Sequence, residues 1–258
     1  MHHEAIIECQ RLVPEELPFE YHGDALDFGI ARGEVTSIIG PDYSGKGNWL
    51  RTICGLEDPL SGSVHIKGID TMNLSEQDWS MTRRKVAYLH EDIALLSAAN
   101  GLANVLAPAF YHQLDKQAEK GLLAESALEL LEQIDPDINL DDLPAYISKD
   151  HQFKIAVARA LLLEPEVLAL NSPFAHFNPD SKHKFQCFLN NQVKQGLSLL
   201  IVTHDIGYAL DISDKIIFAS RENIIYFDSP QAILDCDLPM VNRFIQQTET
   251  RSAFDVKQ

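Results

Sequence analysis

Short apolar runs alternate along the chain with segments whose apolar residues recur at helical spacing. The runs at 34–39 (EVTSII), 167–170 (VLAL) and 197–203 (LSLLIVT) have the length and composition of buried strands. From 101 to 163 the pattern is helical, with leucine and alanine at three- and four-residue steps. Buried strands alternating with helices predict an α/β fold with a parallel sheet covered on both faces. Further strands are expected at 63–67, 85–89, 215–219 and 223–227, and helices at 46–55, at 179–196 and in a short tail.

The helix expected at 179–196 carries clear end signals. Asn178 can cap it, Pro179 fits its first turn, and Gly196 can end it. The acidic segment before it, at 135–144 (DPDINLDDLP), is expected to be a solvated connection rather than a metal site, because runs of like charge usually face water.

The charge of the chain restricts its partners. Its 258 residues carry 38 acidic and 21 basic side chains, for a formal net charge of −17. Such a surface repels nucleic acid and anionic lipid, so neither is expected as a direct partner. The N-terminus has no cationic lead, and no stretch approaches the roughly 18 apolar residues of a spanning helix. These features predict a soluble chain that reaches a membrane only through a partner. Four scattered cysteines without a C-x-x-C pair are expected to be buried and reduced: Cys9, Cys54, Cys187 and Cys236.

A glycine-rich loop between the strand at 34–39 and the helix at 46–55 is the main candidate site. Gly40, Gly45 and Lys46 have the G-x-x-x-x-G-K spacing, in which backbone amides and a helix N-terminus receive phosphate and the lysine bridges the outer phosphates. The flanking elements favour this interpretation over a chance glycine loop. Nucleotide contacts are therefore predicted at Gly40, Pro41, Asp42, Tyr43, Ser44, Gly45, Lys46, Gly47 and Asn48.

Three segments extend this motif in a familiar order. The segment at 40–64 begins with the loop, IAVARALLLEPEVLALNSPF follows at 155–174, and LLIVTHDIGYALDISDKIIF at 199–218. Over about residues 20–235 the chain resembles the ATPase subunits of ABC transporters. The resemblance implies a P-loop NTPase fold, with a RecA-like core, an N-terminal antiparallel β edge and an inserted helical subdomain. The expected domains are 1–92 and 165–235 for the two halves of the core, 93–164 for the helical insertion and 236–258 for a helical tail.

The resemblance also implies partners and ligands. The chain is expected to bind ATP or ADP and to form a head-to-tail dimer with itself or with another ABC ATPase chain. It is expected to dock on a membrane permease subunit, and so to be cytoplasmic and peripheral on the inner face of the membrane. Tyr21 is either the side chain that stacks on adenine or ordinary edge packing.

Several positions depart from the family's pattern. In the loop, Gly47 replaces the serine or threonine that ligates Mg²⁺, and Asn48 replaces the next hydroxyl. Asp42 adds a negative charge near the phosphates, and Tyr43 adds bulk. Lys46 is kept. These changes argue against Mg²⁺ as a firm cofactor, so no metal ligand is assigned.

The catalytic positions of the family are also altered. Asn171 and Ser172 replace an Asp–Glu pair that holds Mg²⁺ and activates the attacking water. Glu91 aligns with the family's switch glutamine, where it either replaces part of the lost charge or faces solvent. The switch histidine is kept as His204. Asn178 stands where the family usually has an aspartate.

The family's Leu-Ser-Gly-Gly-Gln signature, which binds the partner chain's nucleotide, becomes ISKDH here. Its residues are Ile147, Ser148, Lys149, Asp150 and His151. Only the serine is retained, and the β-carbons of Lys149 and Asp150 oppose the close backbone approach that paired glycines allow. A partner chain would therefore find a changed signature as well as a changed catalytic site.

These departures favour a nucleotide-binding subunit without hydrolysis, with a structural or regulatory role on a permease. One alternative is an active transport ATPase that uses replacement ligands such as Glu91. Another is a soluble ABC-type protein without a permease, for which the sequence offers no second cassette and no long heptad segment. Within transporters, 100–112 (NGLANVLAPAFYH) and 237–245 (DLPMVNRFI) are similar to ATPase subunits of MCE-associated lipid importers.

Overall fold

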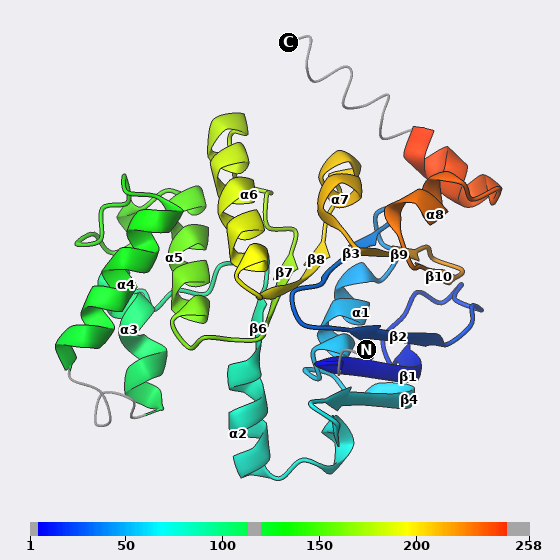
Figure 1. Cartoon of the computed structure of the whole chain (residues 1–258), viewed down its shortest axis with the longest axis horizontal. Coiled ribbons are helices and arrows are strands. Elements are labelled where there is room, and N and C mark those ends of the chain that lie inside the picture. Colours follow the sequence, from blue (N-terminus) through cyan, green and yellow to red (C-terminus); the bar gives the residue numbers. More distant parts are fainter. Residues whose placement is uncertain (1–4, 113–119, 247–258) are drawn as a thin grey trace. The chain divides into compact units, whose positions relative to one another are not determined.

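The computed structural model describes residues 5–112 and 120–246. The chain forms two compact units. Residues up to Ser75 and from Ser198 onward make the first unit, and Glu76–Leu197 make the second. In Figure 1 the first unit contains the blue N-terminal strands and the orange C-terminal elements, and the second contains the green helices.

An antiparallel sheet begins the first unit. Its order is β2-β1-β4-β5, and Ile7 of β1 lies opposite Ile30 on one side and Ile66 on the other. All three isoleucines are buried, so this face of the sheet belongs to the core. The strands are β1 (Ile7–Pro14), β2 (Leu26–Ile30), β4 (Pro59–Ile66) and β5 (Ile69–Asp70).

A second group of strands in this unit carries the glycine-rich loop. The strand β3 pairs in parallel with β8 on one side and β9 on the other, and β10 pairs antiparallel with β9. Every residue of β3 and β8 is buried, as expected for strands that are covered on both faces. The strands are β3 (Val35–Ile39), β8 (Ser198–Val202), β9 (Lys215–Ala219) and β10 (Ile224–Phe227).

The helices of this unit pack on those strands. Trp49 and Leu50 of the first helix are fully buried, and a second core cluster joins Ile39 and Phe218 to Val241 near the C-terminus. The helices are α1 (Lys46–Ile53), the 3₁₀ turn η1 (Thr71–Asn73), α7 (Ile206–Ile212) and α8 (Pro230–Leu234), and residues 239–246 are also helical.

The second unit combines two parallel strands with a group of helices. The strands β6 (Val86–Leu89) and β7 (Val167–Asn171) pair in parallel. Phe153, Phe174, Phe177, Phe185 and Phe188 form an aromatic cluster that joins two of the helices to the segment after β7. The helices are α2 (Glu76–Lys85), α3 (Gly101–Tyr111), α4 (Lys120–Ile134), η3 (Pro144–Tyr146), α5 (Lys149–Leu161) and α6 (Pro179–Lys194).

The predicted α/β class is confirmed, and six expected strands are found within one residue of their predicted ends. Asn178 caps α6 as expected, since its Oδ1 accepts a hydrogen bond from the amide of Ser181. The strand expected at 63–67 is longer and starts at Pro59. Helix α2 was not predicted, because its sequence EQDWSMTRRK is too polar to show a clear apolar stripe. The four-domain division stays a prediction, and 247–258 of the expected tail lie outside the described residues.

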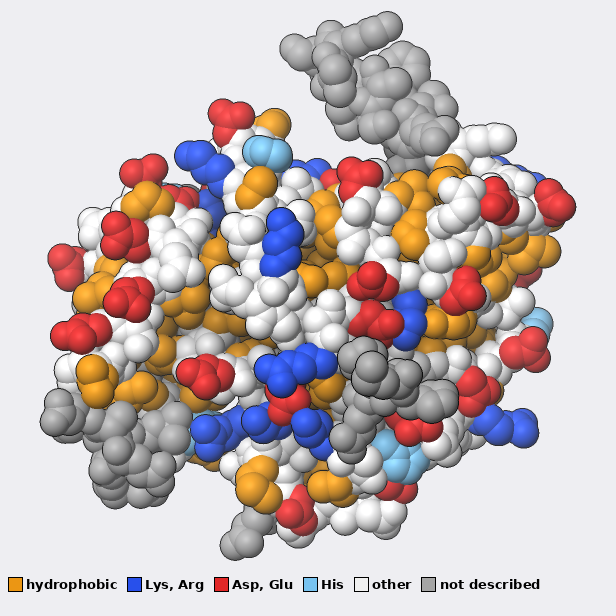
Figure 2. Space-filling view, in the orientation of Figure 1, with side chains coloured by type: hydrophobic (Ala, Val, Ile, Leu, Met, Phe, Trp, Pro, Cys, Tyr) orange, Lys and Arg blue, Asp and Glu red, His pale blue; other side chains and the backbone are white. Residues whose placement is uncertain are grey.

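The structure bears on two expectations about the surface, the burial of the cysteines and the acidic charge. Cys187 is exposed and Cys236 is only partly buried, which is contrary to the prediction that all four cysteines are buried. Acidic side chains spread over the part of the surface formed by α3, α4 and α5, as Figure 2 shows. This distribution agrees with the net charge of −17.

Candidate functional site

The phosphate loop, residues 40–48, connects β3 to α1 as the sequence predicts. Gly40 has φ 146°, and a β-carbon there would lie 1.9 Å from the backbone oxygen of Ala219 on the neighbouring strand. Only glycine fits this close approach. Gly45 has φ 80° and forms the N-cap of α1. The backbone of Tyr43 is in the left-handed region (φ 58°), which residues other than glycine rarely occupy.

Lys46 is folded back onto the phosphate loop. Its Nζ donates hydrogen bonds to the carbonyl oxygens of Gly40 (2.9 Å) and Pro41 (2.6 Å) and to Ser44 Oγ (3.4 Å). The residue is only 6% exposed. Burial lowers the pKa of Lys46 to about 8, although the charge of Asp42 opposes the shift. The ammonium is therefore held by carbonyl dipoles at the place where a phosphate would compete for it.

The start of α1 has no hydroxyl where the resemblance implies a metal ligand. Gly47 has no side chain, and Asn48 donates from Nδ2 to Glu16 Oε2 (3.4 Å). Among residues 5–112 and 120–246, no group of three His, Cys, Asp or Glu side chains is arranged to hold a metal ion. The loop's chemistry is thus that of backbone amides and one lysine.

His204 lies beside the phosphate loop. Its Nδ1 is 3.5 Å from Asp42 Oδ1, and both side chains are more than half exposed. The parallel pairing explains the meeting, because Ile38 of β3 lies opposite Val202 of β8 and both strands end at the same edge. The sequence indicated His204 as a candidate but did not indicate Asp42 as its partner, and a catalytic role for His204 stays a prediction.

The Tyr21 side chain packs at the edge of the first unit. Its ring centre is 6.1 Å from that of Trp49, and its hydroxyl donates to the backbone oxygen of Asp24 (2.6 Å). Burial, helped by the charge of Asp24, raises the pKa of Tyr21 to about 12. This geometry favours the packing interpretation, and stacking on adenine stays a prediction.

In the second unit, the candidate catalytic residues follow the two parallel strands. Leu89 of β6 lies opposite Leu170 of β7, so Asn171 at the end of β7, Ser172 after it and Glu91 after β6 lie at the same edge of the two strands. Asn171 is buried, and Ser172 has φ 50°. Glu91 is exposed. Only Glu91 among these three carries a charge.

The residues of ISKDH form the start of α5. Ser148 is the N-cap, and its Oγ accepts a hydrogen bond from the amide of His151 (3.2 Å). Ile147 is buried, whereas Lys149 is exposed and its Nζ donates to Gln152 Oε1 (3.3 Å). The helix start is therefore regular, but its two glycine positions carry charged side chains.

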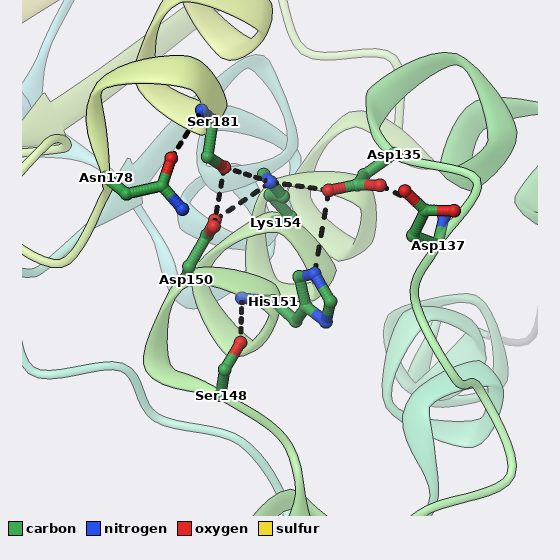
Figure 3. A network of polar contacts seen from close by, with 8 residues as sticks. All are labelled: Asp135, Asp137, Ser148, Asp150, His151, Lys154, Asn178 and Ser181. Atoms are coloured by element: carbon green, nitrogen blue, oxygen red, sulfur yellow. Dashed lines mark hydrogen bonds and ion pairs between the residues drawn. The ribbon is translucent and has the colours of Figure 1, made fainter.

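Asp150 points into the second unit rather than out from the helix (Figure 3). Its Oδ1 is 2.9 Å from Lys154 Nζ, and its Oδ2 accepts a hydrogen bond from Ser181 Oγ (2.5 Å) at the start of α6. Lys154 also donates to Ser181 Oγ (2.6 Å) and to Asp135 Oδ2 (2.6 Å), while His151 Nε2 lies 3.6 Å from the same Asp135 oxygen. We call Asp135, Asp150, Lys154 and Ser181 the buried network.

The buried network was missed from the sequence. The spacing of Asp150 and Lys154, four residues apart on a helix, was the available signal. For Asp135 the expectation of a solvated connection is wrong, because its side chain is 13% exposed and ion-paired with Lys154. Burial alone would raise the pKa of Asp135, but hydrogen bonds from Lys154 and from the Asp137 amide, with the charges of Lys154 and His151, lower it below the usual value.

Comparison with known proteins identifies the family. The family model described as "ABC transporter" matches residues 24–175. The chain belongs to the ABC transporter family. It is 29% identical over 209 residues to the glutamine transport ATP-binding protein GlnQ of Escherichia coli, covering 81% of this chain and 85% of that protein. It is 30% identical over 195 residues to the methionine import ATP-binding protein MetN of Brucella abortus, covering 75% of this chain and 52% of that protein.

Solved structures agree on the fold. A dimeric post-hydrolysis state of the ATP-binding cassette MJ0796, bound to ADP and phosphate, aligns with TM-score 0.76 and 24% identity over 86% of this chain and 98% of that one. The subunit cbiO1 of Clostridium perfringens, part of the transporter complex cbiONQ, aligns with TM-score 0.73 and 20% identity. The chain thus has the P-loop NTPase fold of an ABC cassette.

Within this ABC cassette, the described side chains can provide two kinds of chemistry. The phosphate loop offers backbone amides and Lys46 to an anion. The end of β7 offers an amide and a hydroxyl, from Asn171 and Ser172, and neither is a carboxylate. Charge for binding phosphate is present at the loop, whereas a carboxylate base is absent from these two positions.

Proposed function

We propose that this chain is the nucleotide-binding subunit of an ABC transporter that has lost hydrolysis and serves a structural or regulatory role. The observation that carries the proposal is the pair Asn171–Ser172 at the end of β7. A carboxylate there would hold a divalent ion and accept a proton from water. An amide and a hydroxyl supply neither charge nor a base of suitable pKa.

The phosphate loop supports retained nucleotide binding. Its strand–loop–helix geometry is intact, and Lys46 remains within reach of a phosphate. The ligand is ATP or ADP, and the bound state of MJ0796 supports this choice. Gly47 removes the Mg²⁺ ligand from the loop, so binding depends little on Mg²⁺.

The residues at the start of α5 support a loss of binding to the partner chain's nucleotide. In a head-to-tail dimer it would face the other chain's nucleotide through its backbone amides. Here Lys149 and Asp150 replace the two glycines, and the buried network holds Asp150. Dimer formation is supported by the relatives solved as dimers, but neither site of such a dimer would have a complete set of catalytic groups.

The partner is a membrane permease, and the chain is bound through it to the inner face of the membrane. Among the described residues, no helix is long and apolar enough to cross a bilayer. Relatives named for glutamine and methionine transport support a transporter subunit over a soluble ABC protein. Their names favour amino acids as the transported class, whereas lipid transport rests on the short segments at 100–112 and 237–245.

A binding experiment tests the proposal. Calorimetry with ATP is expected to give similar affinities in Mg²⁺ and in EDTA, and Lys46→Ala is expected to weaken binding strongly. Lys194→Ala at the exposed end of α6 removes the same charge elsewhere and serves as the matched control. A strict requirement for Mg²⁺, accompanied by steady turnover, would instead support an active ATPase with Glu91 as a replacement ligand.

Nucleotide binding is expected to take up a proton above pH 8. Lys46 has a pKa of about 8 in the free protein, and bound phosphate raises that pKa by stabilising the charged form. Affinity should therefore fall as pH rises through 8, by roughly tenfold between pH 7.5 and 9. Calorimetry in buffers of different ionisation enthalpy measures the uptake. Lys46→Met should bind weakly and without the proton, and an unchanged uptake in that variant would assign it to another group.

A further inference from the structure

We propose that the phosphate loop is latched shut by its own unusual side chains, so that a nucleotide must open it to bind. The latch consists of three contacts: Asn48 with Glu16, Asp42 with His204, and Tyr43 with Arg221. The proposal rests on the proposed function, because it concerns nucleotide access to the same loop. All three contacts lie within the first unit.

The connection between β1 and β2 forms one side of the latch. Glu16 accepts a hydrogen bond from Asn48 (3.4 Å). The next two residues, Leu17 and Pro18, pack over Gly45, since a β-carbon built there would lie 3.2 Å from each of them. Gly45 is the N-cap of α1, where free amides would receive a phosphate. The connection therefore lies on the end of the loop that a nucleotide needs.

Two segments from later in the chain form the other side. His204, just before α7, meets Asp42 at 3.5 Å. Arg221, in the turn between β9 and β10, has its Cζ 6.0 Å from the ring centre of Tyr43. Tyr43 is 83% exposed and holds a left-handed backbone (φ 58°), so the cation lies against a ring that the core does not fix. Each contact uses a loop side chain that the family's pattern lacks.

Charge explains why these contacts oppose a nucleotide. The latch places the carboxylate of Glu16 beside a loop that already carries the carboxylate of Asp42, and the ligand of this loop is itself negative. Like charges repel, so phosphate binding is favoured only when these carboxylates are moved away. Surface ion pairs and cation–π contacts are individually weak, and three together bias the loop without closing it permanently.

The connection can also move. Phe19 at its tip is 98% exposed, so burial does not hold the tip in place. Its far end is fixed, because Tyr21 packs on Trp49 and the amide of His22 donates to the Glu222 oxygen (3.0 Å). Residues 15–20 thus behave as a short strap, anchored at both ends and held on the loop by the contacts named above. If most molecules are in the closed state, the apparent affinity for nucleotide equals the affinity of the open state multiplied by the fraction of molecules that are open.

The test is the double variant Glu16→Ala/Arg221→Ala in the full chain. It removes one negative and one positive charge, so net charge is unchanged and a gain in affinity cannot come from overall electrostatics. The matched control is Arg32→Ala/Asp58→Ala, which changes two exposed residues of the same unit outside the latch. Binding of mant-ATP in EDTA should be roughly tenfold tighter in the latch variant, with a faster association rate, and unchanged in the control.

Hydrogen exchange of residues 41–48 without nucleotide provides the second readout. The latch predicts faster exchange there in the Glu16→Ala/Arg221→Ala variant than in wild type or control. Equal exchange and equal mant-ATP affinity in all three would overturn the latch while leaving nucleotide binding in place. Faster exchange without any mant-ATP binding would uphold the latch and instead refute nucleotide binding by this chain.

Discussion

The purified chain is expected to hydrolyse ATP about 10²–10⁴ times more slowly than a cassette with a carboxylate in place of Ser172, because loss of a general base costs that much in rate. Ser172 follows β7 with φ 50°, and its hydroxyl is a poor base at neutral pH. Phosphate release at saturating ATP and Mg²⁺ measures the rate. Wild type and Lys46→Ala should give the same background.

A turnover comparable to that of an ordinary transport ATPase, and abolished by Lys46→Ala, would contradict this expectation. Glu91→Gln then identifies the replacement ligand, because it removes the charge and keeps the size of the exposed side chain after β6. Loss of that turnover in Glu91→Gln would establish the active-ATPase alternative. Turnover that survives Lys46→Ala would come from a contaminating enzyme, since Lys46 is the only Lys or Arg in the phosphate loop, residues 40–48.

Substitutions that restore the family's catalytic residues distinguish the effect of the missing Mg²⁺ ligands from that of the missing base. Gly47→Ser with Asn171→Asp restores two Mg²⁺ ligands, and Ser172→Glu restores the base. The triple variant should gain Mg²⁺-dependent ATP binding, and its comparison with a version carrying Ser172→Gln isolates the base. Steady turnover should still be low in a homodimer, because the start of α5 retains Asp150 in the buried network.

Local patterns carried most of what could be predicted. The phosphate loop, the buried strand before it and the Asn178 cap are set by residues within a few positions of one another. The geometry confirms these three features. Helix α2 was not predicted, because its polar sequence EQDWSMTRRK carries no clear apolar stripe.

Partners distant in sequence could not be predicted. Asp42 and His204 are brought together only because β3 and β8 end at one edge of the paired strands. Likewise Lys154 meets Asp135 and Ser181 across three different segments of the second unit. The periodicity of hydrophobic residues in one sequence does not predict these side-chain contacts, because they depend on how whole helices and strands pack.

The substitution Lys154→Met is expected to lower the free energy of unfolding by about 3–5 kcal/mol, the usual cost of breaking a buried ion pair by removing one partner. Lys154 is 1% exposed, and its ammonium is the cation between Asp135 and Asp150 (Figure 3). Methionine keeps the stem but leaves two carboxylates facing each other. Urea unfolding followed by circular dichroism measures the change.

Lys149→Met is the matched control, because it removes the same charge from the same helix at an exposed position. Its effect on unfolding should be within about 0.5 kcal/mol of wild type, as for most surface changes. Equal losses for the two variants would show that helix charge, rather than the buried network, stabilises the second unit.

The dependence on pH gives a sharper test of the same network. In wild type, interactions with Lys154 help hold the pKa of Asp135 below its usual value of 3.8, so the stability they provide is present at neutral pH and is lost as pH falls through the lowered pKa. Without Lys154, burial would raise the pKa of Asp135, and protonation would relieve the repulsion between the carboxylates. The difference in stability between wild type and Lys154→Met should therefore be largest near neutral pH and shrink below about pH 4. A difference that stays constant across this range would mean that Lys154 stabilises the unit by packing alone.

The same reasoning explains why the signature cannot be restored freely. Asp150→Gly removes one of the carboxylates that pair with the buried Lys154 ammonium, so replacing Asp150 by the family's glycine lowers the stability of this unit before the helix start can serve a partner's nucleotide.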